Sequence, residues 1–346
     1  MPPRSLTSGM AQATALTRSG KLTDATAHIQ RLLGGSLPDI AVPKSRKTLA
    51  ESLRQIARGG MPDVHRPPAP ESDARFTAHT YSGPEGARDY MLYIPSVPTS
   101  EPMPVIVMLH GCTQSPQDFA AGTGMNALAE TGGFIVVYPA QASGANANKC
   151  WNWFRPGDQG RGTGEPALIA AITNRVVATQ SADTSRVYVA GLSAGGAAAV
   201  VVAQAYPDLF AAVGVHSGLA AGSANNVGSA FAAMRSGAAG WPVKHRLPTI
   251  VFHGTADTTV AMSNAQAVAK QGLTGQHVVT KGKSAKGRSY TRATLTTGER
   301  TMGEVWLIDG AGHAWAGGST AGSYTDPKGP DASAEMVRFF AQHKLA

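Results

Sequence analysis

The chain has 346 residues, of which 42% are hydrophobic and 15% are charged. This balance is typical of a globular protein and excludes a disordered or fibrous chain, and the length allows one large α/β domain or two smaller ones. No hydrophobic run reaches the roughly 18 residues that a membrane-spanning helix needs, so we do not expect the chain to be an integral membrane protein.

The formal net charge is +8, but its distribution argues against a nucleic-acid partner. Residues 1–75 carry 11 Lys or Arg against 6 Asp or Glu, and the other residues carry 19 against 16. A second basic stretch, residues 280–300, is expected to be a loop followed by a β-hairpin. Zinc-finger spacing and an interleaved ladder of basic and aromatic residues are both lacking. We therefore interpret the excess charge as a solvated basic surface.

The first 75 residues differ in pattern from the rest. Two short helical patterns in residues 9–34 predict a helical hairpin, and the proline-rich stretch HRPPAPES at residues 65–72 predicts a linker. The N-terminus lacks the apolar core of a secretory signal, whereas a bond between the two cysteines would imply an oxidising compartment, so the residues give mixed evidence on location and a cytoplasmic one is the alternative. We expect two parts, an N-terminal segment of residues 1–75 and a larger domain of residues 76–346.

From residue 76 strand patterns alternate with helical patterns. Strands are expected at residues 76–83, 88–96, 104–111, 132–140, 185–191, 210–218, 247–254 and 303–310. Helices are expected near residues 125–131, 165–179, 194–206 and 332–346. This alternation predicts an α/β fold with a mostly parallel sheet and helices on both faces.

The sequence GLSAG at residues 191–195 fits the pattern G-x-S-x-G between an expected strand and an expected helix. In this context the serine occupies a strained turn that presents its hydroxyl at the carboxyl edge of the sheet. Gly191 and Gly195 are needed because a Cβ at either position would collide with neighbouring backbone. The alternative is a turn of small residues, but the strand before and the helix after favour Ser193 as a nucleophile.

A serine nucleophile needs a histidine base and an acid that orients it, in the chain order Ser, Asp or Glu, His. Asp257 follows the strand at residues 247–254, and His313 follows the strand at residues 303–310. These two residues complete the expected triad. Asp309 is instead expected at the surface or in a turn, and His253 is expected to be a buried histidine bonded to backbone.

The segment LHGCTQS at residues 109–115 predicts an oxyanion-hole loop. One backbone N–H donor is expected from Ala194, after the nucleophile, and the other from Cys112. Because the chain has two cysteines, Cys112 and Cys150 either bond to each other, which implies an oxidising compartment, or stay reduced and buried.

The chain resembles the polyhydroxybutyrate depolymerase family of esterases. The motifs that carry the resemblance are LHGCTQS, CWNWF, GEPALIAAIT, RVYVAGLSAGG, YPDLFAAVGVHSGL, HGTAD and GAGHAW. It implies an α/β-hydrolase fold, hydrolysis of short-chain hydroxyalkanoate esters without a cofactor or metal, and an extracellular location. The family also includes feruloyl and acetyl-xylan esterases, and a non-catalytic binding protein of the same fold is a further alternative.

The resemblance also carries over to individual residues. It implies Ser193 as nucleophile, Asp257 as acid, His313 as base and Cys112 at the oxyanion hole. It implies in addition a disulfide between Cys112 and Cys150.

The expected partner is an ester substrate, either a hydroxyalkanoate oligomer or polymer or a cell-wall ester, and no membrane partner is expected. Trp151 and Trp315 are expected to contact it, although simple packing is an equal alternative. Secreted polymer depolymerases of the family carry added linker and binding domains, which are not seen here. This difference favours soluble esters or oligomers, and the sequence leaves the oligomeric state open.

Overall fold

The computed structural model describes residues 75–96, 101–243, 245–272 and 275–346. The helical hairpin predicted for residues 9–34 and the linker predicted at residues 65–72 lie outside the described residues. The division of the chain at residue 75 therefore stays a prediction.

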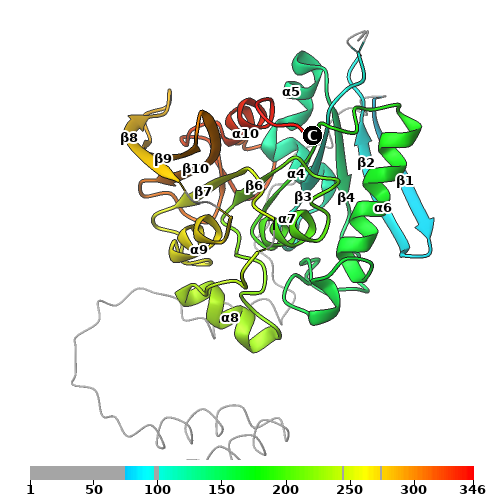
Figure 1. The fold of residues 1–346 in the computed structure, drawn as a ribbon, viewed down its shortest axis with the longest axis horizontal. Helices are drawn as coiled ribbons and strands as arrows, with labels where there is room; N and C mark the ends of the chain where they lie inside the picture. The colour runs from blue at the N-terminus through cyan, green and yellow to red at the C-terminus, as the bar shows by residue number, and fades with distance from the viewer. Residues whose placement is uncertain (1–74, 97–100, 244, 273–274) are drawn as a thin grey trace, which may run out of the picture. The chain divides into compact units, whose positions relative to one another are not determined.

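Ten strands form one sheet in the order β1-β2-β4-β3-β5-β6-β7-β10-β9-β8 (Figure 1). The six central strands, β4-β3-β5-β6-β7-β10, are parallel to their neighbours in this series. At the two sides β1 and β2, and β8 and β9, pair antiparallel. The strands are β1 (Phe76–Gly83), β2 (Gly86–Tyr93), β3 (Val105–Leu109), β4 (Ile135–Pro139), β5 (Val187–Leu192), β6 (Ala212–His216), β7 (Thr249–Gly254), β8 (Gln276–Lys283), β9 (Ser289–Thr297) and β10 (Arg300–Ile308). The predicted mostly parallel sheet is confirmed.

One predicted loop is wrong. The stretch that starts at residue 280 was expected to begin with a loop, but β8 runs to Lys283 and pairs with β9. All of β8 except Gly282 is exposed, so it lacks the alternating hydrophobic pattern that identifies a strand with one buried face. Tertiary pairing at the sheet edge decides its conformation.

The central strands are buried along their whole length. Every residue of β3, β4, β5, β6 and β7 is buried, which matches their continuous apolar sequences. Parallel strands have this pattern because helices cover both faces of the sheet. Alternate residues of β3 enter different cores: Val105 and Val107 contribute to one, and Ile106 and Met108 to the other.

Helices α6, α7, α8 and α9 pack in the first core, and α4, α5 and α10 pack in the second. They are α4 (Pro116–Thr123), α5 (Met125–Gly132), α6 (Gly164–Thr179), α7 (Ala194–Ala205), α8 (Val227–Ser236), α9 (Ser263–Gly272) and α10 (Ala332–Phe340), with a 3₁₀ turn at Pro156–Asp158. The last helix was predicted to run to residue 346 but ends at Phe340, and the Leu345 N–H then bonds to the Ser185 carbonyl. Within the described residues, no helix has the length and hydropathy needed to cross a bilayer.

The parallel strands end at one edge of the sheet, so their loops meet there. The loops after β3, β5, β7 and β10 contain Cys112, Ser193, Asp257 and His313, respectively. A short parallel pair, β11 (Trp315–Ala316) and β12 (Thr325–Asp326), follows β10 at the same edge.

Candidate active site

Ser193 occupies the sharp turn between β5 and α7. Its backbone has φ 59° and ψ −120°, a region that residues other than glycine rarely adopt. Its N–H donates to the His216 carbonyl at 2.8 Å, and 9% of the residue is exposed. Strain of this kind persists only where the surrounding structure holds it, and it is the geometry expected of a nucleophile elbow.

The two glycines around Ser193 are required by close backbone contacts, as predicted. A Cβ on Gly191 would lie 2.4 Å from the Gly195 carbonyl oxygen, and a Cβ on Gly195 would lie 2.0 Å from the Leu109 carbonyl oxygen. Both contacts involve backbone atoms, which cannot swing aside as a side chain can. The elbow is therefore packed directly against the end of β3.

Gly195→Ala is expected to destabilise the protein by about 3 kcal/mol or more, because the added methyl overpacks a rigid backbone contact. Chemical denaturation followed by circular dichroism measures the change. Gly144→Ala is the matched control, since nothing lies within 4 Å of a Cβ built there. Equal stability of the two variants would contradict the packing described for the elbow.

Asp257 and His313 lie together, although 56 residues separate them in the chain. The His313 Nδ1–H donates to Asp257 Oδ2 at 2.7 Å, and the Asp257 side chain is fully buried. The other Asp257 oxygen accepts 2.9 Å bonds from the Thr259 and Val260 N–H groups. This arrangement leaves His313 Nε2 as the ring nitrogen that can accept a proton.

The surroundings of Asp257 keep its carboxylate charged. Burial by itself raises the pKa, but the hydrogen bond and charge of His313 and the two backbone donors outweigh it, so the pKa of Asp257 is lowered. The carboxylate therefore stays ionised at neutral pH, as the orienting acid of a triad must.

The structure does not join Ser193 to the other two residues directly. In the described part of the chain, the Ser193 hydroxyl makes no hydrogen bond to His313. Catalytic bonds of this type often tighten only in the Michaelis complex. The complete triad thus stays a prediction, of which the structure supplies the elbow and the acid–base pair.

The two competing residues behave as expected. His253 is buried, and its Nε2–H donates to the Val260 carbonyl at 2.8 Å. Burial lowers its pKa, so the ring stays neutral. Asp309 is exposed, and its backbone N–H bonds to Ser289 on β9.

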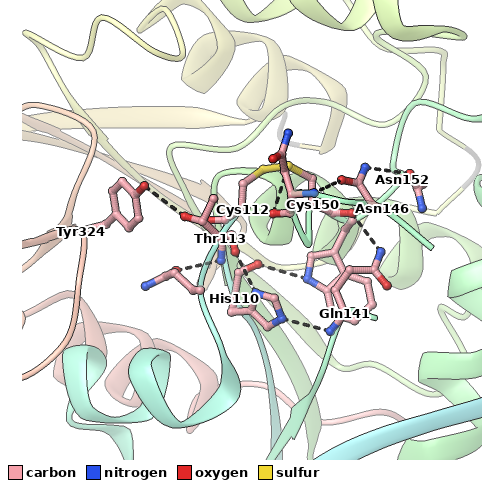
Figure 2. The surroundings of a disulfide bond; sticks show 12 residues. His110, Cys112, Thr113, Gln141, Asn146, Cys150, Asn152 and Tyr324 are labelled. Atoms are coloured by element: carbon pink, nitrogen blue, oxygen red, sulfur yellow. Dashed lines mark hydrogen bonds between the residues drawn. A yellow bond between two sulfur atoms is a disulfide. The ribbon is translucent and has the colours of Figure 1, made fainter. Parts of the chain in front are cut away.

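A disulfide joins Cys112 to Cys150 and thereby links the loop after β3 to residues 148–153 (Figure 2). The implied disulfide is confirmed. Further bonds hold the loop from both sides: the Thr113 N–H donates to the Asn148 carbonyl at 2.7 Å, and the Trp151 Nε1–H donates to the His110 carbonyl at 3.1 Å. The loop that carries the Cys112 amide is therefore fixed in place.

The amides of Cys112 and Ala194 are the predicted oxyanion donors. Neither N–H donates to any other residue in the ranges that the structure describes, whereas the Gly111 N–H is taken up by Gln114 Oε1 at 2.9 Å. Ala194 is the first residue of α7, where N–H groups have no partner within the helix. Both amides remain available for a developing negative charge.

A buried carboxylate, Glu165, organises the other side of this loop and was missed by sequence reasoning. It accepts hydrogen bonds from the Asn152 N–H at 2.7 Å, from Asn152 Nδ2 at 2.8 Å and from Gln141 Nε2. The Gln141 N–H in turn donates to His110 Nε2 at 3.1 Å. Glu165 thus supports the disulfide region and the oxyanion loop together, and an acidic residue at the start of α6 was the available signal.

A model of the family described as Esterase PHB depolymerase matches residues 88–294, more than half of the chain. The chain belongs to this family. The matched region includes Ser193 and Asp257 and ends before His313. Within the described residues, no cluster of three His, Cys, Asp or Glu residues is arranged to hold a metal ion.

Relatives of the chain include a polyester depolymerase and a feruloyl esterase. The chain is 41% identical over 191 residues to poly(3-hydroxyalkanoate) depolymerase C of Paucimonas lemoignei, covering 51% of this chain and 46% of the relative. It is 39% identical over 140 residues to feruloyl esterase B of Thermothelomyces thermophilus, covering 40% and 47%. The chain spans about half the length of the curated relatives that it matches.

An acetyl xylan esterase structure from Aspergillus awamori matches with a TM-score of 0.59 and 21% identity, covering 77% of this chain and 99% of that one. This likeness supports the fold alone. The predicted α/β-hydrolase fold is confirmed.

His216, at the end of β6, connects two loops of the candidate site. Its carbonyl accepts from Ser193, and its Nε2 accepts from the Ala316 N–H at 3.0 Å. The ring stacks between Phe252 and Trp315, with centroids 5.9 and 5.2 Å away. Burial and the neighbouring histidines lower the pKa of His216 to about 3, so the ring stays neutral and can accept the Ala316 bond.

This buried neutral ring predicts a pH-dependent stability. A folded pKa of about 3 against an unfolded value of about 6.5 means that only the unfolded chain protonates His216 in this range. The contribution of His216 is full well above pH 6.5 and falls as the pH decreases, with a slope that approaches about 1.4 kcal/mol per pH unit below pH 6.

Urea unfolding at pH 7, 6 and 5 measures this dependence. Between pH 6 and 5 the slope for wild type should exceed that for His216→Gln by about 1 kcal/mol per pH unit, and exposed His79 supplies the control variant His79→Gln. Identical slopes for wild type and His216→Gln would contradict a neutral buried ring.

Trp151 and Trp315 do not take the place expected for them in the candidate site. Trp151 is 0% exposed and Trp315 is 1% exposed, and each packs in one of the two cores. The Trp315 Nε1–H donates to Ser333 Oγ at 3.0 Å. Their burial corrects the expectation of direct substrate contact. The Trp151 Nε1–H instead bonds to the His110 carbonyl, and the Trp315 ring stacks on His216.

Proposed function

We propose that the protein is a serine carboxylic-ester hydrolase that forms an acyl-enzyme on Ser193. The observation that carries the proposal is the 2.7 Å bond between His313 and buried Asp257 at the same sheet edge as the strained Ser193 elbow. Membership of an esterase family supports it independently.

The geometry supports acyl transfer in two halves. His313 Nε2 takes the proton of the Ser193 hydroxyl as the oxygen attacks the ester carbonyl, and Asp257 stabilises the resulting imidazolium. The Cys112 and Ala194 amides hold the oxyanion, where each donor is worth about 10²–10³ in rate. His313 then protonates the leaving alcohol, and water repeats the attack on the acyl-enzyme.

The proposed substrates are short-chain hydroxyalkanoate esters. The likeness to a poly(3-hydroxyalkanoate) depolymerase, at 41% identity, supports this class. A second candidate is a feruloyl or acetylated cell-wall ester, supported by likeness to feruloyl esterase B and, at 31% identity, to probable acetylxylan esterase A of Neosartorya fischeri. We propose no nucleic-acid or membrane partner.

We further propose an extracellular location, with the cytoplasm as the alternative. The support is the Cys112–Cys150 disulfide, because such bonds persist in oxidising compartments. Intact mass of the native protein with and without reductant tests the point. Free thiols in protein isolated without reductant would favour the cytoplasm.

A panel of substrates tests the proposed chemistry. It contains soluble 3-hydroxybutyrate oligomers, amorphous polyhydroxybutyrate, methyl ferulate and acetylated xylan, each assayed with wild type and with Ser193→Ala. We expect the fastest turnover with the hydroxybutyrate esters. Fastest turnover with methyl ferulate or acetylated xylan would instead support the second candidate substrate class. Turnover of none of the four would reject the esterase proposal.

A further inference from the structure

One exposed aromatic side chain lies beside the proposed oxyanion loop. Tyr324 is 47% exposed, and its phenol oxygen lies 3.1 Å from Oγ1 of Thr113, the residue after Cys112 (Figure 2). Its carbonyl accepts a 2.7 Å bond from the N–H of Trp315, two residues after His313. Tyr324 therefore spans from the loop of the proposed base to the loop of the proposed oxyanion donor.

The backbone of Tyr324 is strained. Its φ is 52°, in the left-handed region that bulky residues rarely adopt, and Thr113 opposite has φ 65°. Asparagine or glycine would occupy such a position at lower cost. Strain retained at an aromatic residue points to a role for the side chain itself.

The segment that carries Tyr324 is clamped to α4. The N–H and hydroxyl of Ser323 donate to the Asp118 carboxylate at 2.9 and 2.5 Å, and Gln114 Nε2 donates to the Ser323 carbonyl at 3.2 Å. A Cβ on Gly322 would lie 2.4 Å from the Asp118 carbonyl oxygen, so loop and helix are in backbone contact. The Tyr324 ring is thus held in a defined position.

The other exposed large hydrophobic residues lie elsewhere. Within the described ranges they fall on α8, on the segment after it and on β8: Val227, Phe231, Trp241, Val278 and Val279. The tryptophans expected to meet the substrate are buried. Tyr324 is the exposed ring whose hydrogen bonds reach both loops of the proposed site.

We propose that Tyr324 contacts the substrate next to the reacting carbonyl and selects for 3-hydroxyacyl oligoesters. This inference rests on the proposed esterase function. With the carbonyl oxygen at the Cys112 amide and its carbon at Ser193, the proposal places the acyl side of the ester along Thr113 and Tyr324. The ring supplies apolar area at low entropic cost, and the phenol can bond the repeating oxygens of an oligoester.

The test compares a long and a minimal substrate, the linear trimer of 3-hydroxybutyrate and p-nitrophenyl acetate. Tyr324→Ala should raise KM for the trimer about 10-fold, the loss expected for one aromatic contact. kcat/KM for p-nitrophenyl acetate should stay within about 3-fold of wild type, because its acetyl group is too short to need the contact. Phe231→Ala removes a ring on α8 that is 56% exposed, and it should leave the kinetics with both substrates unchanged.

A second variant separates substrate contact from folding. Asparagine tolerates the left-handed backbone, so Tyr324→Asn should unfold at or above the wild-type temperature while losing trimer affinity as Tyr324→Ala does. This combination would not arise if Tyr324 only supported the fold.

Two results overturn the inference alone: trimer and acetate activities that fall by the same factor in both Tyr324 variants, or a trimer KM that does not change. A wild-type enzyme that hydrolyses neither substrate overturns the proposed function and the inference with it.

Discussion

Ser193→Ala is expected to lower kcat for ester hydrolysis by about 10⁶-fold, since the proposed acyl-enzyme forms on the hydroxyl that this change removes. The hydroxyl lies on the strained turn at the carboxyl edge, and alanine keeps the backbone while removing only the oxygen. Hydrolysis of p-nitrophenyl acetate, followed by release of p-nitrophenolate, measures the loss. Far-UV circular dichroism should be unchanged.

Ser185→Ala is the matched control for this experiment. Ser185 lies two residues before β5, at the opposite end of the strand that leads to Ser193, and its hydroxyl donates to Asp183 at 2.7 Å. Its removal should leave kcat near the wild-type value. A phosphonate probe should label wild type and Ser185→Ala but not Ser193→Ala. Normal turnover in Ser193→Ala would reject Ser193 as the nucleophile.

Asp257→Asn is expected to lower kcat by about 10⁴-fold with little change in KM, because an amide cannot stabilise the imidazolium and favours the wrong tautomer of His313. The effect should be large because the carboxylate is fully buried and bonded to Nδ1 at 2.7 Å. Steady-state kinetics with p-nitrophenyl acetate measures both constants.

The control is Asp309→Asn, which changes an exposed carboxylate four residues before His313. It should leave kcat unchanged, and equal losses in the two variants would contradict the assignment of Asp257. The pKa of Asp257 is lowered, so its stabilising contribution is present above about pH 4 and is lost as the pH falls through the folded value. The stability difference between wild type and Asp257→Asn should therefore shrink only below about pH 4.

Local sequence determined the parts of this protein that depend on neighbouring residues. Continuous apolar runs predicted the buried central strands because both faces of a parallel sheet are covered. The pattern G-x-S-x-G predicted the elbow because its glycines meet backbone, as Gly195 meets Leu109. Chain order then singled out Asp257 and His313, and the resemblance to a family implied the disulfide.

The tertiary structure alone decided which side chains face solvent and which loops touch. Trp151 and Trp315 are buried while Tyr324 is exposed, a difference that aromatic composition does not encode. The contacts of Glu165 with Asn152 and of Tyr324 with Thr113 join segments distant in the chain. Such contacts depend on the order of strands in the sheet and on the paths of the loops, which no local pattern specifies.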